Sequence, residues 1–150
     1  MTPSRNLILI NVDYLREDFV SGNWADTPYL DEISNDGIEC RNLHATTTTT
    51  APSVASILTG MYSENNGVNS LREAELNKDV PTMSKTFTQA GFGSTGLVLS
   101  PLAKEVEFYR GFDHYYYRKN DDYLVDDWYE TALNRIKTLL NRSFFTFISG

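Results

Sequence analysis

Short apolar runs in this chain alternate with polar segments that have helical spacing. Residues 6–12 are almost all apolar, which predicts a central parallel strand covered on both faces. Similar runs at residues 94–100 and 144–149 predict two more buried strands. Residues 38–45 are less apolar and predict a strand or an extended segment.

The segments between these apolar runs contain residues that favour the start or the end of a helix. Three short helices are predicted, each with a proline near its start and a glycine at its end: 27–37, roughly 52–59, and 81–91. In the first of them, Leu30 and Ile33 share the face expected to pack inward. Apolar residues recur every four positions from Asp122 onward, which predicts an amphipathic helix of about 18 residues. Strands that alternate with helices are typical of an α/β fold with a doubly wound, mostly parallel sheet flanked by helices.

The length of 150 residues suits one domain, and 41% hydrophobic residues suit a globular protein. The chain stops at Gly150, directly after the last predicted strand, so we expect the carboxyl-terminal part of the fold to be missing. An unfinished sheet exposes an apolar edge, so we also expect self-association through that edge.

The composition limits the classes of binding partner and the cellular compartment that we expect for this protein. The net charge of −7, without clustered Lys and Arg, argues against nucleic acid and anionic membranes as partners. The sequence has no apolar run of membrane-spanning length and no secretory signal at its start, so we expect a soluble, cytoplasmic protein. The single cysteine, Cys40, excludes an intramolecular disulfide and a cysteine-based zinc cluster. It lies in a segment of strand-like pattern, where we expect a buried, small apolar side chain rather than a reactive thiol.

Two side chains are candidates for chemistry. Asp13 follows the first predicted strand, and ligand sites of open α/β sheets lie at such carboxyl ends. Thr50 precedes the proline-initiated helix, whose free N–H groups favour an oxyanion opposite the threonine hydroxyl. The alternatives are a loop or cap residue for Asp13 and an ordinary helix cap for Thr50.

Other polar residues near these positions are expected to be structural. Arg16 and Asp18 are expected to pair with each other or with neighbouring backbone rather than to touch a substrate. His44 and His114 are weak candidates for a base or a ligand, and structural roles are expected for both.

Several segments, taken in order, resemble the amino-terminal part of the sulfatase family in the alkaline phosphatase superfamily. They are the first strand with its Asp-x-Leu-Arg-x-Asp turn (6–18), the Thr-Pro-x-Leu-Asp helix (27–37), Thr-Ala-Pro-Ser with Leu-Thr-Gly (50–60), and the landmarks at 89–92 and 111–113. The resemblance implies an alkaline-phosphatase-like fold in which residues 1–150 are the amino-terminal part of one domain. It also implies hydrolysis of a small sulfate or phosphate ester, with Thr50 as nucleophile and with Asp13 and Thr50 as ligands of a divalent metal ion (Ca²⁺, Mg²⁺, Mn²⁺ or Zn²⁺).

The chain departs from the family pattern at three positions. Sulfatases carry Cys or Ser at the position of Thr50 and convert it to formylglycine, which the threonine methyl group prevents. Val54 stands where the signature has Arg, and Cys40 lies ten residues too early to substitute for the nucleophile. We therefore expect no formylglycine. In the superfamily, an unmodified threonine is used by phosphodiesterases, phosphatases and phospho-group transferases. Tyr14 replaces a second Asp found in many sulfatases, so one metal ligand is missing or comes from elsewhere.

Two oxygen ligands hold a divalent ion poorly, since Mg²⁺ takes six and Ca²⁺ about 6–8. We therefore expect the chain alone to bind metal weakly and to be nearly inactive, either as part of a longer enzyme or as a partner of a completing chain. One alternative is a non-catalytic fragment or binding module that keeps the fold. Another is a sulfate ester hydrolase that works without formylglycine.

Overall fold

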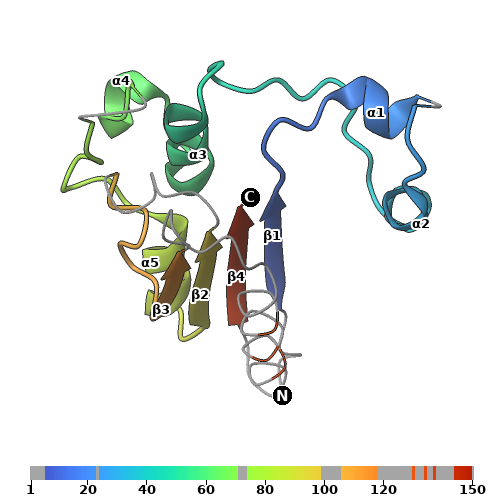
Figure 1. Ribbon diagram of the computed structural model, residues 1–150. Coiled ribbons are helices and arrows are strands. Elements are labelled where there is room, and N and C mark those ends of the chain that lie inside the picture. The colour runs from blue at the N-terminus through green and yellow to red at the C-terminus, as the bar shows by residue number, and fades with distance from the viewer. Residues whose placement is uncertain are drawn as a thin grey trace.

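The computed structural model describes residues 6–22, 24–70, 74–98, 106–117 and 144–149, together with positions 130, 134 and 137. These residues form an α/β fold in which helices flank a parallel sheet (Figure 1). In chain order the elements are β1 (Leu7–Asn11), α1 (Glu17–Ser21), α2 (Pro28–Asp36), α3 (Thr50–Thr59), α4 (Ser63–Asn66), α5 (Met83–Gln89), β2 (Gly93–Val98), β3 (His114–Tyr117) and β4 (Phe144–Ser149). The long helix predicted from Asp122 onward lies outside the described residues, apart from three isolated positions.

The sheet confirms the predicted fold class. Its four strands run in the order β1-β4-β2-β3, and every neighbouring pair is parallel. The last strand of the chain, β4, therefore lies between β1 and β2. Its Phe147 is in register with Leu9 on one side and with Gly96 on the other. Because parallel strands share one direction, all their carboxyl ends meet at the same edge of the sheet, where α3 lies (Figure 1).

The core lies on the side of the sheet that faces α3 and α5. Its buried hydrophobic residues are Ala51, Val54, Ala55, Leu58, Val68, Ala74, Leu76, Val98, Val106, Phe108 and Phe147. Phe147 has no exposed surface, and its ring stacks on that of Phe112 with centroids 6.5 Å apart and an angle of 26° between the ring planes. Helix α3 supplies four members of this set because its apolar residues recur along one face. Among the described residues, every helix falls short of the length and apolar character that a membrane crossing requires.

Residues 6–12 were predicted to form a central strand, whereas β1 has only one neighbour among the described strands. Of the described strands it lies at one edge of the sheet, and Ile8 and Ile10 remain 47% and 63% exposed. The apolar run identified the strand correctly. It could not show that β4 would be the only described strand beside β1.

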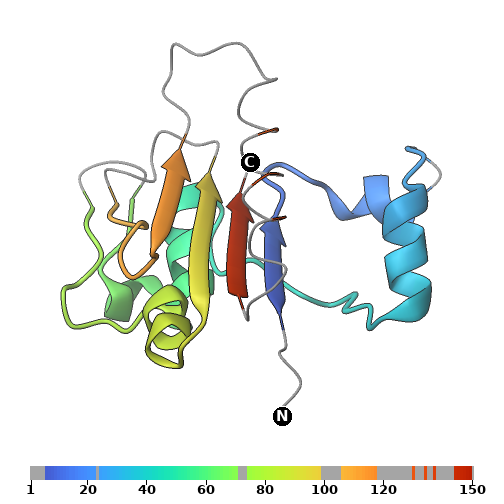
Figure 2. The same cartoon turned by 90° about the horizontal axis from the view of Figure 1, so that it is seen from below.

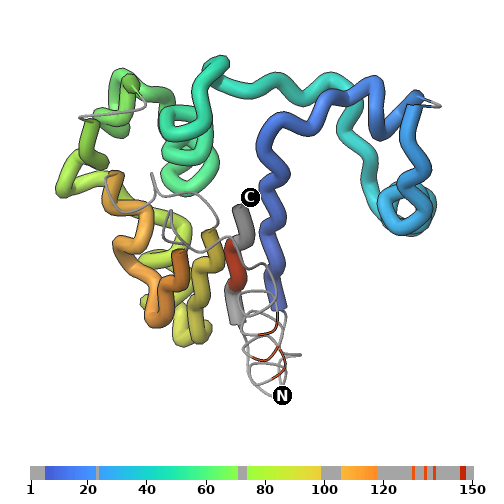
Figure 3. Tube along the Cα trace, in the orientation of Figure 1, coloured from blue at the N-terminus to red at the C-terminus, as the bar shows by residue number. Residues whose placement is uncertain are grey.

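The segment between β1 and α3, residues 13–49, arches away from the sheet and is called the arm below (Figure 3). Helix α2 has the predicted bounds, yet neither α1 nor α2 contains a buried residue. Leu30 and Ile33, expected to face inward, are 42% and 67% exposed. Their spacing does define one helix face, but that face stays largely exposed.

Of the two alternatives for residues 38–45, the strand is wrong, because these residues form no strand and connect α2 to the threonine run. The expectation for Cys40 is also wrong, because this residue is exposed instead of buried. Beside it, Arg41 Nε donates to Glu39 Oε1 at 3.0 Å, and this hydrogen bond lowers the pKa of the Glu39 carboxyl. The local pattern resembled a strand, but none of the described strands pairs with this part of the chain.

Tyr115 on β3 allows a test of the packing beside the core. Its hydroxyl is buried without a hydrogen-bond partner among the described residues, and burial raises the pKa of the phenol. Tyr115→Phe is therefore expected to stabilise the protein by about 1 kcal/mol at neutral pH, since an unmet polar group is removed. The raised pKa makes the wild type lose stability as the pH climbs above about 10, the value in the unfolded chain, and the variant should lack this loss.

Urea unfolding at neutral and alkaline pH measures both effects. Tyr109→Phe is the matched control, because Tyr109 is 45% exposed and belongs to the same aromatic group, with its ring centroid 6.3 Å from that of Tyr115. A wild type and a Tyr115→Phe variant with the same alkaline loss would show that Tyr115 is not the group responsible.

Candidate active site

The structure brings the two predicted site residues together. Asp13 lies two positions beyond the end of β1, and Thr50 is the first residue of α3. The Thr50 hydroxyl donates a hydrogen bond to Asp13 Oδ2 at 3.1 Å, and both residues are half-buried. Residues that are 37 positions apart in sequence thus meet at the carboxyl end of the sheet.

Helix α3 begins two residues earlier than the sequence predicted. Thr49 occupies the extended N-cap position, with φ −120° and ψ 143°, so Thr50 lies inside the first turn instead of in front of it. Gly60 closes the helix as expected, with φ 67° and its N–H donating to Ser56 O at 2.8 Å. The Thr50 hydroxyl therefore lies at the positive end of the helix dipole, where negative charge is stabilised.

The turn after β1 sets the position of Asp13. Tyr14 adopts a left-handed backbone conformation with φ 57°, which costs energy for a bulky residue. Its backbone N–H donates to Asp13 Oδ1 at 3.2 Å, and its side chain is 93% exposed. The carboxylate of Asp13 is thus held by the backbone through one oxygen and by Thr50 through the other.

The threonine run before α3 is tied together by its own hydroxyls. Thr49 N donates to Thr47 Oγ1 at 3.0 Å, and the hydroxyls of Thr47 and Thr49 lie 3.1 Å apart. Such contacts fold the backbone into a local turn. This turn delivers Thr50 to Asp13 and explains why the run consists of residues with short hydroxyl side chains.

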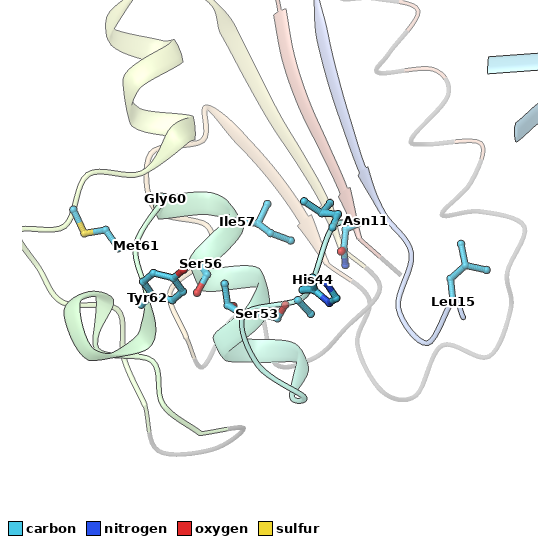
Figure 4. Close-up of a pocket in the computed structure, with 12 residues that line it drawn as sticks. Asn11, Leu15, His44, Ser53, Ser56, Ile57, Gly60, Met61 and Tyr62 are labelled. Atoms are coloured by element: carbon cyan, nitrogen blue, oxygen red, sulfur yellow. The ribbon is translucent and has the colours of Figure 1, made fainter. Parts of the chain in front are cut away.

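A cavity of about 640 Å³ lies beside this pair, between α3, the end of the arm and β1 (Figure 4). Its lining residues are Asn11, Leu15, Leu43, His44, Ala45, Thr46, Ser53, Ser56, Ile57, Gly60, Met61 and Tyr62. Neither Asp13 nor Thr50 belongs to this set, although Ser53 is one helical turn from Thr50. No pattern in the sequence had predicted this cavity. Asn11, a polar residue that interrupts the first apolar run, was the available signal.

The remaining candidates fall into two groups. His44 lines the cavity, whereas His114 begins β3, at the amino end of a strand on the far edge of the sheet from β1. His114 is therefore remote from Asp13. Arg16 and Asp18 form the predicted ion pair, with Arg16 Nη2 2.6 Å from Asp18 Oδ2.

The Asp13 carboxylate and the Thr50 hydroxyl fit part of a site for a hard divalent ion. Two neighbouring ligands of an octahedral ion, each about 2.1 Å from the metal, lie about 3 Å apart, which is the separation of these two oxygens. No group of three or more His, Cys, Asp or Glu side chains that could hold a metal occurs within the described parts of the chain. Val54, at the position of the signature arginine, is buried in the core with 4% of its surface exposed. No cation from that position faces the pair.

Sequence comparison gives consistent matches along the chain. The family model described as Sulfatase matches residues 5–149. An N-acetylglucosamine-6-O-sulfatase of Bacteroides thetaiotaomicron is 34% identical over 112 residues, which cover 71% of this chain and 19% of that protein. Human arylsulfatase G is 32% identical over 124 residues, which cover 74% of this chain and 23% of that protein. The chain thus spans about a fifth of the length of these curated relatives.

Two solved structures share the fold. The structure of BT4656 in complex with its substrate D-glucosamine-2-N,6-O-disulfate superposes with a TM-score of 0.80 at 26% identity. The superposition covers 95% of this chain and 33% of that one. A phosphonate monoester hydrolase from Silicibacter pomeroyi superposes with a TM-score of 0.77 at 20% identity, over 96% of this chain and 40% of that one. This second likeness concerns the fold alone.

Proposed function

Because this chain belongs to the sulfatase family, we propose that it carries the nucleophile-bearing part of an enzyme that hydrolyses sulfate or phosphate esters. The proposal rests on one observation, the 3.1 Å hydrogen bond from the Thr50 hydroxyl to Asp13 at the carboxyl end of the sheet. In this proposal residues 1–150 are the amino-terminal part of a single alkaline-phosphatase-like domain. The family matches favour a hydrolase over a non-catalytic binding module.

In the proposed reaction, Thr50 Oγ1 gives its proton to solvent and forms a bond to the phosphorus or sulfur of the ester, while the alcohol oxygen leaves and takes up a proton. Water then cleaves the ester on Thr50, which releases the sulfate or phosphate group and restores the hydroxyl. Asp13 orients the Thr50 hydroxyl by accepting its hydrogen bond, and the first turn of α3 directs N–H groups at the charge that develops on the oxyanion. A free threonine hydroxyl is too weakly acidic to ionise near neutral pH. A divalent ion held by Asp13 and Thr50 would lower the pKa of that hydroxyl and stabilise the charge on the ester oxygens.

The proposed substrate is a small ester that carries an anionic sulfate or phosphate group. The relatives named as sulfatases support a sulfate ester. The unmodified Thr50 supports a phosphate ester, because its methyl group prevents conversion to formylglycine. Parallel assays with an aryl sulfate and an aryl phosphodiester would rank these two chemistries.

Metal binding tests the two proposed ligands directly. Calorimetric titration of the chain with Mn²⁺, Ca²⁺ and Zn²⁺ should give weak binding, since two oxygens meet only part of the coordination demand. Asp13→Asn should remove the binding. Tyr14→Asp should strengthen it by about tenfold or more, since it places a second carboxylate beside Asp13 and suits the left-handed backbone better than tyrosine.

Asp18→Asn is the matched control, because this carboxylate pairs with Arg16 and should leave the titration unchanged. Circular dichroism establishes that every variant is folded. Equal heats from wild type, Asp13→Asn and Tyr14→Asp would remove Asp13 from the proposed metal site.

A further inference from the structure

The cavity beside Asp13 and Thr50 is built by the same parts of the chain that hold these two residues. Asn11, the last residue of β1, lines it two positions before Asp13, and Ser53 lines it one helical turn after Thr50. The chain between α2 and α3 passes from the arm side of β1 across to α3 (Figures 1 and 2), and its residues 43–46 form another wall of the cavity. A ligand whose anionic group lies at Thr50 therefore has this cavity next to it for the rest of its structure (Figure 4).

Helix α3 turns one face to the core and another face to the cavity. Its core residues are Ala51, Val54, Ala55 and Leu58. Its cavity residues are Ser53, Ser56, Ile57 and Gly60. Each set follows the spacing of residues on one helix face, and only Ile57 is large in the second set, so this face leaves room beside the helix. Because the buried set fixes the rotation of α3 about its axis, the wall that α3 contributes to the cavity is formed before any ligand binds, as is usual for small-molecule sites.

The lining of the cavity is mainly apolar and carries no ionic side chain. None of its twelve residues is Asp, Glu, Lys or Arg, although these four types make up 22% of the chain. Leu43, Ile57 and Met61 supply apolar surface, and Tyr62 supplies an aromatic ring. Ser53 supplies a hydroxyl group one turn from Thr50. A charged group on a ligand finds no ionic partner among these side chains, and burying an unpaired charge costs free energy, so the lining suits an uncharged ligand.

We propose that this cavity binds the alcohol part of the ester and that this part is an uncharged, apolar ring. The volume of about 640 Å³ lies within the range of about 300–1,000 Å³ that is typical of small-molecule sites, and it exceeds what a sulfate or phosphate group alone needs. Contacts with the ring then hold the ester group at Thr50. The inference rests on the proposed function, because it places the anionic group of the substrate at Thr50 and the rest of the substrate in the cavity.

Nuclear magnetic resonance of the full chain, labelled at isoleucine and methionine methyl groups, locates the bound ring directly. The probe is 2-naphthol, which is uncharged at neutral pH. Saturable shifts are expected at Ile57 and Met61, but not at Ile33 on α2 or at Met83, which packs against the core. The anionic analogue 6-hydroxy-2-naphthoate should bind more weakly by about tenfold or more, since the lining offers no cation to its carboxylate. Absent shifts at Ile57 and Met61, shifts that are equally large at Ile33, or equal affinities for the two ligands would overturn the proposal.

Substitutions on the cavity wall give a second test. Ile57→Asp places a carboxylate there and should weaken the binding of 2-naphthol by about tenfold or more. Ile33→Asp is the matched control, because Ile33 is 67% exposed on α2, outside the cavity, so the affinity should stay unchanged. Ser53→Phe should also weaken binding, because it fills the space without adding a charge. Circular dichroism identifies the folded variants, and an unchanged affinity in a folded Ile57→Asp or Ser53→Phe variant contradicts the proposal.

Calorimetric titration with 2-naphthyl phosphate and Mn²⁺ separates this proposal from the proposed function. The ester should bind more tightly than 2-naphthol, because Mn²⁺ at Asp13 and Thr50 attracts its phosphate group. Asp13→Asn should remove this gain and leave the binding of 2-naphthol unchanged. If 2-naphthol binds in the cavity and the ester gains nothing from Mn²⁺, the roles proposed for Asp13 and Thr50 are wrong. If 2-naphthol does not bind in the cavity, the present proposal is wrong, whatever the ester does.

Discussion

Replacing Thr50 with alanine is expected to lower ester hydrolysis by about a thousandfold or more, because the nucleophile itself is lost. The assay uses a fusion of residues 5–149 to the remaining part of the N-acetylglucosamine-6-O-sulfatase relative, which supplies the length that this chain does not span. An aryl phosphodiester and an aryl sulfate are measured in parallel. Thr50→Ser keeps a hydroxyl at the same position and should retain far more activity than Thr50→Ala.

Thr59→Ala provides the control for this experiment. Thr59 lies at the other end of α3, where its hydroxyl donates to Ala55 O at 2.6 Å and accepts from Met61 N at 3.2 Å, so the substitution removes a threonine from the same helix and leaves the Asp13–Thr50 hydrogen bond in place. Its activity should stay close to that of the parent fusion. If Thr50→Ala and Thr59→Ala hydrolyse the substrates equally fast, Thr50 has no part in the reaction.

The largest expected effect on stability comes from Phe147→Ala. Phe147 is fully buried in β4 between β1 and β2, and truncation of such a phenylalanine costs about 3–5 kcal/mol. Because domains of this size are stable by only about 5–15 kcal/mol, the variant should lose a large share of its folding free energy. Urea unfolding followed by circular dichroism measures the loss.

Ile38→Ala is the matched comparison, since Ile38 is 94% exposed in the arm. Its free energy of unfolding should stay within about 0.5 kcal/mol of the wild type. Similar losses for the two variants would mean that the core is not centred on β4.

The sequence predicted where helices and strands form better than it predicted which elements pack against one another. The apolar runs at 6–12, 94–100 and 144–149 correspond to β1, β2 and β4, and proline and glycine signals located α2, α3 and α5. These features were predictable because strand and helix patterns depend on neighbouring residues. The proximity of Asp13 and Thr50 followed from a topological rule, since strand carboxyl ends and the helices that follow them meet at one edge of a parallel sheet.

The errors share one physical cause. Periodicity shows which side chains lie on one face, but not which element covers that face, so Leu30 and Ile33 were assigned to the inside although both are exposed. The same limit applies to β1, which was expected to be central and lies at the edge of the described sheet, and to Cys40, which was expected to be buried and is exposed. Helix α3 begins two residues before the predicted start because Thr49 adopts the N-cap conformation. The sequence does not show which of the five consecutive threonines takes this position.

Asp13 and Thr50 lie in regions of the structure that differ in how many buried apolar residues hold them in place. Thr50 begins a helix whose residues fill the core, whereas Asp13 follows the strand at the edge of the sheet and precedes helices without a buried residue. Local opening is easiest where few apolar contacts must be broken, so the arm should open more readily than α3. The fraction of molecules with an assembled pair would then depend on how often the start of the arm, which carries Asp13, stays in place. Any ligand or neighbour that prefers the form with this segment in place would act on the site from a distance by shifting that population.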